Sequence, residues 1–222
     1  MFTQSDFKHW FPIEQTRHYI ADIIPDGAKV LEIGACHIPF PKATTYVDYV
    51  YDPKIDNVVC DVTKERLPFE DKSFDFVYCR HVIEDLWNPF LVLSEMQRVA
   101  KAGYIETPSI AQELARGVGA GSFNFRGHCH HHWFVYNDSG VLKFISKLPW
   151  IEHVEFDEEQ IEHMLKTYPI YWNTYFQWTD KFDFEHVQGQ YPMLQNDIIS
   201  GLHVGYQNAN AFTETIIDHY KE

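Results

Sequence analysis

Short apolar runs and two helical patterns alternate along the first half of the chain. Five runs are rich in β-branched or aromatic residues and have the length of buried strands; they cover residues 29–34, 44–50, 57–61, 74–79 and 103–107. Residues 13–24 and 89–101 instead repeat their apolar positions at helical spacing. The order of strand, helix and strand in the later part of this region predicts a mostly parallel α/β sheet.

The connections between the first three predicted strands are unusually short. Only about ten residues join the first strand to the second, and they include Pro39 and Pro41. Fewer residues join the second strand to the third. A parallel crossover usually needs a dozen residues or more and commonly contains a helix. We therefore expect the first crossover helices to be shortened or missing, with irregular loops or single turns in their place.

Beyond residue 109 the pattern changes to strands joined by short turns. The sequence NDSG at residues 137–140 separates two apolar runs, 132–136 and 141–145, which predicts an antiparallel β-hairpin. Further elements are expected at residues 158–168 (an acidic helix), 171–178 and 182–187 (a strand pair) and 209–220 (a final helix). We expect the later strands to extend the same sheet or to cap it.

Length and composition indicate a single globular domain. The chain has 222 residues, 45% of them hydrophobic, and it shows neither internal repeats nor a low-complexity linker. One domain over residues 1–222 is therefore expected, with a sheet core at 13–109 and C-terminal strands and a hairpin at 110–222.

Acidic residues strongly outnumber basic ones. The 32 acidic and 18 basic side chains give a net charge of −14, which repels phosphate backbones and anionic lipid. Neither nucleic acid nor a membrane is expected as a partner. Apolar runs stay well short of the ~20 residues of a membrane helix, and the N-terminus lacks the pattern of a secretory signal. Four scattered cysteines without a CxxC pair favour a cytoplasmic protein with reduced thiols.

Acidic residues close the first three predicted strands. The first run ends in Glu32-Ile33-Gly34, and Asp48 and Asp61 end the next two. The carboxyl ends of parallel strands form the edge at which open α/β sheets bind ligands, and a glycine there permits close approach. Asp48 is placed to accept hydrogen bonds from ribose hydroxyls and Asp61 from an adenine amino group. The alternative is three solvated acids at strand ends.

Ordered motifs then indicate a family. The run DVTKERLPFEDKSFDFV at residues 61–77 resembles the LPF and SFD segment of class I S-adenosylmethionine-dependent methyltransferases of the methyltransferase-11 type. HVIEDLWNP at residues 81–89 is similar to the histidine-containing segment that follows it in that family, and EMQRV and GYIETPS continue the match in order. The resemblance covers residues 13–109 and implies a Rossmann-like sheet that binds S-adenosylmethionine.

The same resemblance assigns the first cofactor motif. Glu32 and Gly34 belong to it, and the backbone near Ala35 and Cys36 is implied to face the methionine part of the cofactor. The common motif has further glycines, which are absent here. The IPFP sequence at residues 38–41 resembles an uncharacterised subgroup of the family with a shortened loop at this position.

The remaining cofactor positions follow the later strands. The resemblance places Asp48 at the ribose and Asp61, with the backbone of Val62, at the adenine. Arg80 and His81 follow the fourth strand and are implied to face the region of the methyl donor and acceptor.

Catalysis by such a protein rests on alignment of donor and acceptor, with a base for the acceptor's proton. His81 is the first candidate base. His130, in the run GHCHHHW at residues 127–133, is the second. Imidazole and thiolate are good zinc ligands, but adjacent ligands seldom close a tetrahedral site, so no metal site is predicted. Strand alternation would send His130 and His132 to one face and His131 to the other.

The leading functional hypothesis is therefore an S-adenosylmethionine-dependent methyltransferase that acts on a small-molecule or saccharide acceptor. A methyltransferase-like binding or scaffold protein without catalysis is the first alternative, because the first motif lacks its usual glycines. A metal-binding protein that uses residues 128–132 is the second. A dinucleotide oxidoreductase is disfavoured by the absence of GxGxxG.

Overall fold

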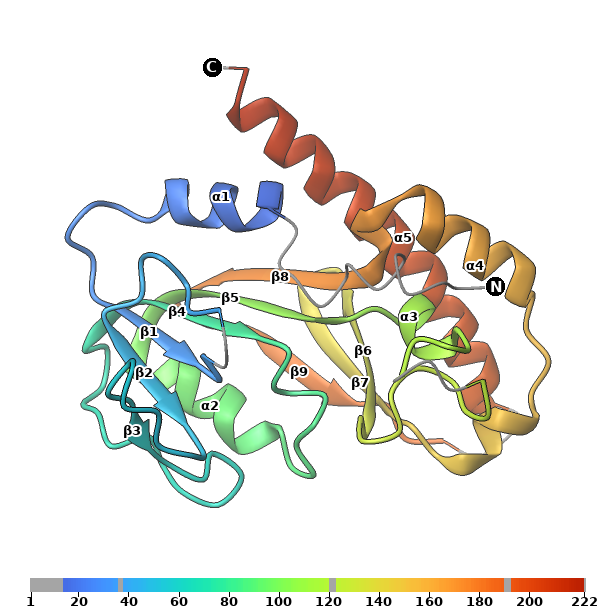
Figure 1. Cartoon of the computed structure of the whole chain (residues 1–222), viewed down its shortest axis with the longest axis horizontal. Helices are drawn as coiled ribbons and strands as arrows, with labels where there is room; N and C mark the ends of the chain where they lie inside the picture. The colour runs from blue at the N-terminus through green and yellow to red at the C-terminus, as the bar shows by residue number, and fades with distance from the viewer. Residues whose placement is uncertain (1–13, 36–37, 120–122, 190–192, 222) are drawn as a thin grey trace.

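The computed structural model describes residues 14–35, 38–119, 123–189 and 193–221, and its centre is a six-stranded sheet (Figure 1). The strand order is β3-β2-β1-β4-β5-β8, with all neighbours parallel except β5 and β8. The strands are Val30–Ile33 (β1), Thr45–Asp48 (β2), Val58–Val59 (β3), Phe74–Arg80 (β4), Ala100–Pro108 (β5) and Asn173–Thr179 (β8). The predicted mostly parallel sheet with an antiparallel C-terminal strand is confirmed.

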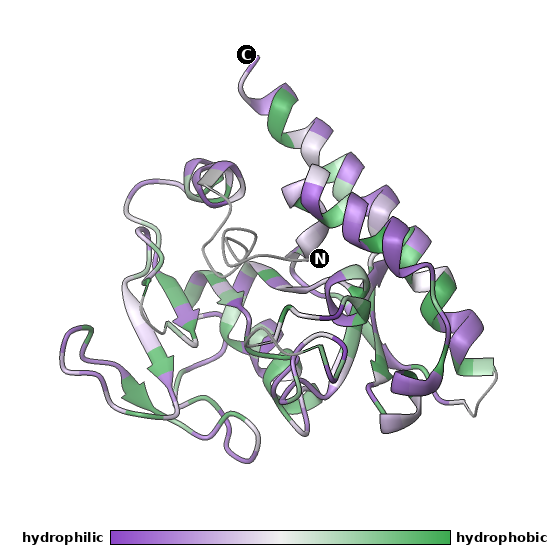
Figure 2. Ribbon diagram, turned by 45° about the vertical axis from the view of Figure 1, so that its right-hand side comes forward, coloured by the Kyte–Doolittle hydropathy of each residue, from purple (hydrophilic) through white to green (hydrophobic). Residues whose placement is uncertain are grey.

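Helices cover both faces of this sheet (Figure 1). α2 (Phe90–Val99) packs on one face, while α1 (Glu14–Ile23) and α5 (Met193–His219) lie on the other. Side chains alternate between the two apolar layers, so that in β4 Val77 packs on the α2 side and Tyr78 on the α1 side. The central strands are mostly hydrophobic, whereas α5 interleaves hydrophobic and hydrophilic residues (Figure 2).

In the part of the chain that the structure describes, no helix joins β1 to β2 or β2 to β3, as predicted. Side chains hold the first connection instead. The backbone N–H of Phe40 donates to Oε2 of Glu32 at 2.7 Å, and the Phe40 ring stacks on Tyr78 with centroids 4.1 Å apart. Arg17 donates to the carbonyl of Pro39. The short loop is thus tied to the carboxyl end of β1 and to the core.

A second sheet has three strands in the order β6-β7-β9. They are Trp133–Asp138 (β6), Val141–Ser146 (β7) and Asp183–His186 (β9). β6 and β7 form the predicted hairpin. Ser139 and Gly140 have φ of 54° and 88°, the positive values of a two-residue type I′ turn.

β8 and β9 do not pair with each other, so the prediction of a strand pair over residues 171–187 is wrong. β8 lies antiparallel to β5 over seven paired residues, and β9 lies parallel to β7. The long edge of β5 offers β8 a complete ladder. β9 has four residues and pairs instead with β7 of the second sheet.

The predicted acidic helix is confirmed, but the final helix is longer than predicted. The described residues also form four short helices: α3 (Ile110–Leu114), the 3₁₀ helices η2 (Pro149–His153) and η3 (Pro169–Trp172), and α4 (Glu158–Thr167). α5 begins at Met193, well before the expected residue 209. Gly201 weakens the helical signal, yet it lies where a Cβ would meet Cδ1 of Ile110 at 2.7 Å. Among the described residues, no helix is both long and apolar enough to cross a membrane.

Candidate active site

A cavity of about 300 Å³ opens at the carboxyl ends of β1, β2 and β3. This is the edge at which open α/β sheets bind ligands. Four of the predicted cofactor residues line it, together with two apolar residues of the loop after β4: Gly34, Asp48, Asp61, Val62, Val82 and Leu86. A larger cavity of about 550 Å³ lies at the opposite ends of β4 and β5, where Asp75 is its acidic residue. The predicted cofactor-binding residues that line a cavity therefore line the smaller of the two.

Gly34 is required by its backbone and by a close neighbour. Its φ is +76°, a conformation that other residues rarely adopt, and a Cβ there would lie 2.2 Å from Cγ2 of Val82. The glycine therefore makes room for Val82. The sequence predicted that Gly34 would leave space for a ligand, but in this structure Val82 occupies that space.

Asp48 and Asp61 present ordered carboxylates to the cavity. Oδ1 of Asp48 accepts the N–H of Tyr49 at 2.6 Å. Oδ2 of Asp61 accepts from Nζ of Lys64 at 2.8 Å, and its Oδ1 accepts from Thr63. The hydrogen bonds from Lys64 and Thr63 lower the pKa of Asp61 to about 2, so this carboxyl is ionised at neutral pH.

Glu32 and Ala35 lie beside the cavity and do not line it. The Glu32 side chain is buried beneath the short loop and is occupied by Phe40. Burial raises the pKa of Glu32 to about 7, although the hydrogen bond from Phe40 and the positive charge of Arg17 oppose this. Ala35 is also buried. Cys36 lies outside the described residues, so its predicted role near the methionine group stays a prediction.

Arg80 enters a buried polar network at the end of β4. Its Nε lies 3.1 Å from Oε1 of Glu106, which also accepts from Nδ2 of Asn173 at 2.7 Å. The other oxygen of Glu106 accepts from the hydroxyl of Tyr104 at 2.6 Å. Arg80 is thus held next to the cavity without lining it.

His81 begins the loop after β4 in a positive-φ conformation, with φ of 52°. Its Nδ1 lies 3.1 Å from Oε1 of Glu84, whose other oxygen accepts from the Thr107 hydroxyl at 3.0 Å. Nε2 of His81 is buried and has no hydrogen-bond partner among the residues that the structure describes. A carboxylate on one ring nitrogen fixes the orientation of the ring and leaves the other nitrogen unbonded. His81, like Arg80, is not among the residues that line the cavity.

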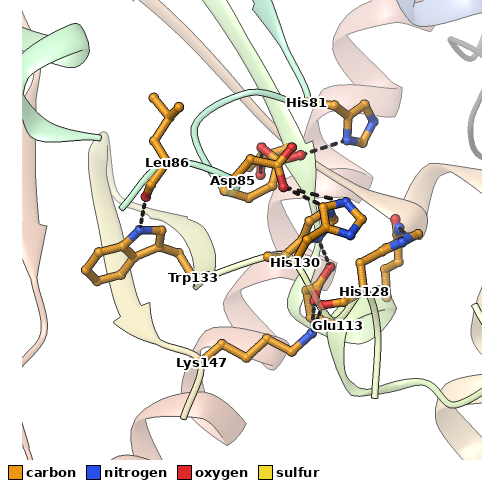
Figure 3. Close-up of polar contacts among 12 residues, drawn as sticks. His81, Asp85, Leu86, Glu113, His128, His130, Trp133 and Lys147 are labelled. Atoms are coloured by element: carbon orange, nitrogen blue, oxygen red, sulfur yellow. Dashed lines mark hydrogen bonds and ion pairs between the residues drawn. The ribbon is translucent and has the colours of Figure 1, made fainter. Parts of the chain in front are cut away.

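The same loop joins the cavity to a second cluster of polar side chains (Figure 3). Oδ1 of Asp85 lies 3.6 Å from Nε2 of His130 and 3.5 Å from Nε2 of His131. Burial and the neighbouring Glu84 raise the pKa of Asp85 to about 7. Backbone contacts fix the loop here, since the N–H of His132 donates to the carbonyl of Glu84 at 2.8 Å.

The cluster continues into the core through Glu113. Oε1 of Glu113 lies 2.6 Å from Nδ1 of His131, and its Oε2 pairs with Lys147. Burial acts to raise the pKa of Glu113, but Lys147 and His131 together lower it to about 2. The hydroxyl of Ser109 caps α3 by accepting from the N–H of Gln112 at 3.1 Å. Glu113 is a buried residue in the first turn of this helix.

The histidine run does not follow strand alternation, so that prediction is wrong. His128, His130 and His131 gather together, while His132 turns away and stacks on Trp87 with centroids 3.7 Å apart. The reason is that the run precedes β6 and forms a turn. Gly127 starts this turn with φ of +56°, and a Cβ there would lie 2.4 Å from Oε2 of Glu113.

Sequence reasoning missed the acidic partners of the histidines. Glu113 and Lys147 attract no attention in a motif search, because their partners are distant in the chain. Glu84 lies within the HVIEDLWNP segment, but the motif does not reveal its contact with His81. One signal was present: Glu113 lies in IAQEL, where a single acid stands among residues that are all buried. Such an acid needs a buried cation or hydrogen-bond donor.

The sheet order and the cavity at its carboxyl edge define an α/β fold of the Rossmann-like methyltransferase type. Residues 43–105 match the family described as methyltransferase domain. This segment is thus similar to the class I methyltransferase family that the motifs indicated. No curated protein matches the chain.

Solved structures with similar segments include methyltransferases from three organisms. A Thermotoga maritima S-adenosylmethionine-dependent methyltransferase is 23% identical over 48% of this chain and 55% of its own, with a TM-score of 0.36. An Anabaena variabilis protein, provisionally assigned as a methyltransferase of antibiotic biosynthesis, is 20% identical over 45% and 47%, with a TM-score of 0.37. The match thus spans about half of each of these two proteins. A provisionally assigned Haloferax volcanii methyltransferase, solved with the Trm112 activator, is 15% identical over 78% and 90%, with a TM-score of 0.41.

Proposed function

We propose that this protein is an S-adenosylmethionine-dependent methyltransferase that binds its cofactor at the carboxyl ends of β1, β2 and β3. The observation that carries the proposal is the meeting of Asp48, Asp61 and Val62 around one cavity in the segment of the family match. These three residues come from the ends of two different strands, and the fold brings them together at the edge where ligands bind.

The cavity fits the nucleoside part of the cofactor best. Asp48 would accept hydrogen bonds from the ribose hydroxyls, and Asp61 from the adenine amino group. Val62 and Leu86 supply apolar surface for the base. A volume of about 300 Å³ is at the small end for a ligand pocket, and Val82 covers Gly34. The cavity therefore supports binding of the nucleoside half of S-adenosylmethionine only.

The cofactor supplies a methyl group already activated on a sulfonium. The chain's own contribution is alignment, exclusion of water and removal of a proton from the acceptor. Of the two predicted bases, His81 is favoured because Glu84 orients its ring and leaves Nε2 facing away from the carboxylate. Nε2 would take the proton of an acceptor hydroxyl or amine. His130 stays the second candidate.

A small molecule or a saccharide remains the proposed acceptor. Trp87 follows Leu86 of the cavity, and its side chain is 80% exposed while stacked on His132. An exposed, supported indole suits the flat apolar face of a sugar ring. The net charge of −14 argues against a nucleic-acid acceptor.

Calorimetric titration with S-adenosylhomocysteine tests the proposal. We expect micromolar binding that weakens about tenfold or more in Asp48→Ala, the loss of a charge-assisted hydrogen bond. Asp218→Ala is the matched control, because Asp218 is an exposed acid of α5 away from the cavity, and it should bind like the natural protein. Absence of binding by the natural protein would favour the alternative of a non-catalytic binding module, for which the covered Gly34 is the supporting observation.

A further inference from the structure

Three histidines that strand alternation would have separated meet at one point. His128, His130 and His131 each offer a ligand atom, and these atoms all lie within 4.8 Å of one another. A carboxylate oxygen of the loop after β4 lies against two of them. We propose that this cluster binds one Zn²⁺ ion; the histidine site consists of His128, His130, His131 and Asp85. This inference does not depend on cofactor binding.

The distances suit tetrahedral coordination. Zinc binds imidazole nitrogen and carboxylate oxygen at about 2.0–2.1 Å, which puts neighbouring ligand atoms roughly 3.3–3.4 Å apart. Oδ1 of Asp85 lies 3.5 Å from Nε2 of His131 and 3.6 Å from Nε2 of His130. The histidine ligand atoms lie within 4.8 Å of one another, so side-chain rotations would have to draw the set together around an ion.

His131 is held on the ring nitrogen that faces away from Asp85, as zinc-binding histidines usually are, and His128 has a side-chain contact of its own. Nδ1 of His131 lies 2.6 Å from the Glu113 carboxylate. Nε2 of His128 lies 3.3 Å from the side-chain nitrogen of Gln112, whose buried Oε1 has no hydrogen bond among the described residues. Rotating this amide by 180° would let its oxygen accept from His128. Both supporting residues come from α3.

A buried oxygen without a hydrogen bond and the local charge point to a cation. Oδ1 of Asp85 is buried and has no hydrogen bond among the residues that the structure describes. Within the same described part of the chain, the carboxylates of Glu84, Asp85 and Glu113 surround the site, and Lys147 pairs with Glu113. Buried carboxylates in excess of cations are costly, and a divalent ion would compensate them.

Four protein ligands would leave no open position, which is the coordination number of a structural zinc site. The ion would join the loop after β4 to the turn before β6. That loop also carries Val82 and Leu86 of the cavity, so the ion would fix one cavity wall. His130 is 58% exposed, which gives the ion a path from solvent.

Calorimetric titration of the tag-free, chelator-treated full chain with Zn²⁺ provides the test. We expect one ion per chain, with affinity about tenfold or more lower in His130→Ala and in Asp85→Asn. His130 is exposed, so its removal should leave folding intact. His132→Ala is the matched control, since His132 belongs to the same histidine run but stacks on Trp87. It should bind as the natural protein does.

Two independent measurements accompany the titration. Zn²⁺ should raise the Tm of the natural protein and of His132→Ala but not that of His130→Ala. Co²⁺ in place of Zn²⁺ should give the intense visible absorption of a tetrahedral site. The proposal is overturned if the natural protein binds no Zn²⁺, or if His132→Ala weakens binding as much as His130→Ala, which would indicate chelation by the run itself.

Discussion

Oε1 of Glu84 lies 3.1 Å from Nδ1 of His81, and the two side chains come from the same turn after β4. His81 has a positive φ, and the short span from residue 81 to 84 brings its ring back onto the carboxylate. The pair resembles the base-and-orienter arrangement of acid–base catalysis, in which the carboxylate selects the tautomer of the imidazole.

Replacing His81 with asparagine tests its role as the base. Asparagine tolerates positive φ, so the loop should keep its conformation. We expect kcat to fall by about 10²–10⁴, the usual contribution of a general base, while the affinity for S-adenosylhomocysteine changes little. Steady-state kinetics and calorimetry on the same preparation separate the two effects. Turnover at the natural rate would remove His81 from the mechanism.

The contact between Gly34 and Val82 predicts a measurable coupling. Gly34→Ala places a Cβ on Val82 and forces positive φ on a non-glycine residue, so we expect the free energy of unfolding to fall by about 2–4 kcal/mol. Adding Val82→Ala should relieve the clash and restore part of the loss, although the backbone strain remains. Urea unfolding of the two single variants and the double variant measures this as a cycle. Strictly additive effects would contradict the contact.

The raised pKa of Glu32 predicts how stability depends on pH. Because its pKa is about 7 in the folded protein and 4.5 ordinarily, the folded state binds this proton more tightly. The stabilisation from this proton is complete below about pH 4.5 and is lost as the pH rises through 7. Glu32→Gln keeps an oxygen for the Phe40 N–H but cannot ionise. The free energy of unfolding of Glu32→Gln, measured relative to that of the natural protein, should therefore rise by roughly 2–3 kcal/mol from pH 5 to pH 8. Denaturant unfolding of both proteins at pH 5 and pH 8 measures this. An equal difference in unfolding free energy between the two proteins at both pH values would exclude the raised pKa.

The buried pair of Lys147 and Glu113 should matter far more than a surface pair. Both side chains are almost fully buried, so Lys147→Met leaves Glu113 without its main cation and should cost about 3–5 kcal/mol of stability. Lys166→Met removes a solvent-accessible helical pair with Glu162 and should cost about 0.5 kcal/mol or less. Denaturant unfolding compares them directly. Similar losses in the two variants would mean that the Glu113 pair is not buried in solution.

Local patterns were sufficient to find most elements of the fold. The apolar runs that became β1, β2, β4 and β5 are continuous in sequence, and the turn at residues 137–140 carries its own conformational signal. Pairing is different, because it depends on which edge is open after the rest has folded. β8 pairs with the edge of β5, and no local sequence feature of residues 171–187 predicts this pairing.

The site shows the same division. Asp48 and Asp61 were predictable because strand ends meet at one edge of a parallel sheet. Glu32 was assigned to the cofactor motif, but its carboxylate accepts a hydrogen bond from the N–H of Phe40 in the short loop after β1. Glu113 could not be assigned a role, since its partners His131 and Lys147 lie 18 and 34 residues away along the chain.

The connection after β1, which contains no helix in its described residues, also affects which charge the cavity selects. A helix there would turn its positive end toward the ligand and favour anionic groups. In this protein the nearby Phe40 N–H is already bonded to Glu32, and the cavity presents the carboxylates of Asp48 and Asp61. Such a site discriminates in favour of a cation. The sulfonium donor carries one more positive charge than the thioether product, so the product should dissociate more readily. Added salt should weaken the binding of the donor more than that of the product, a difference that calorimetry at two ionic strengths resolves.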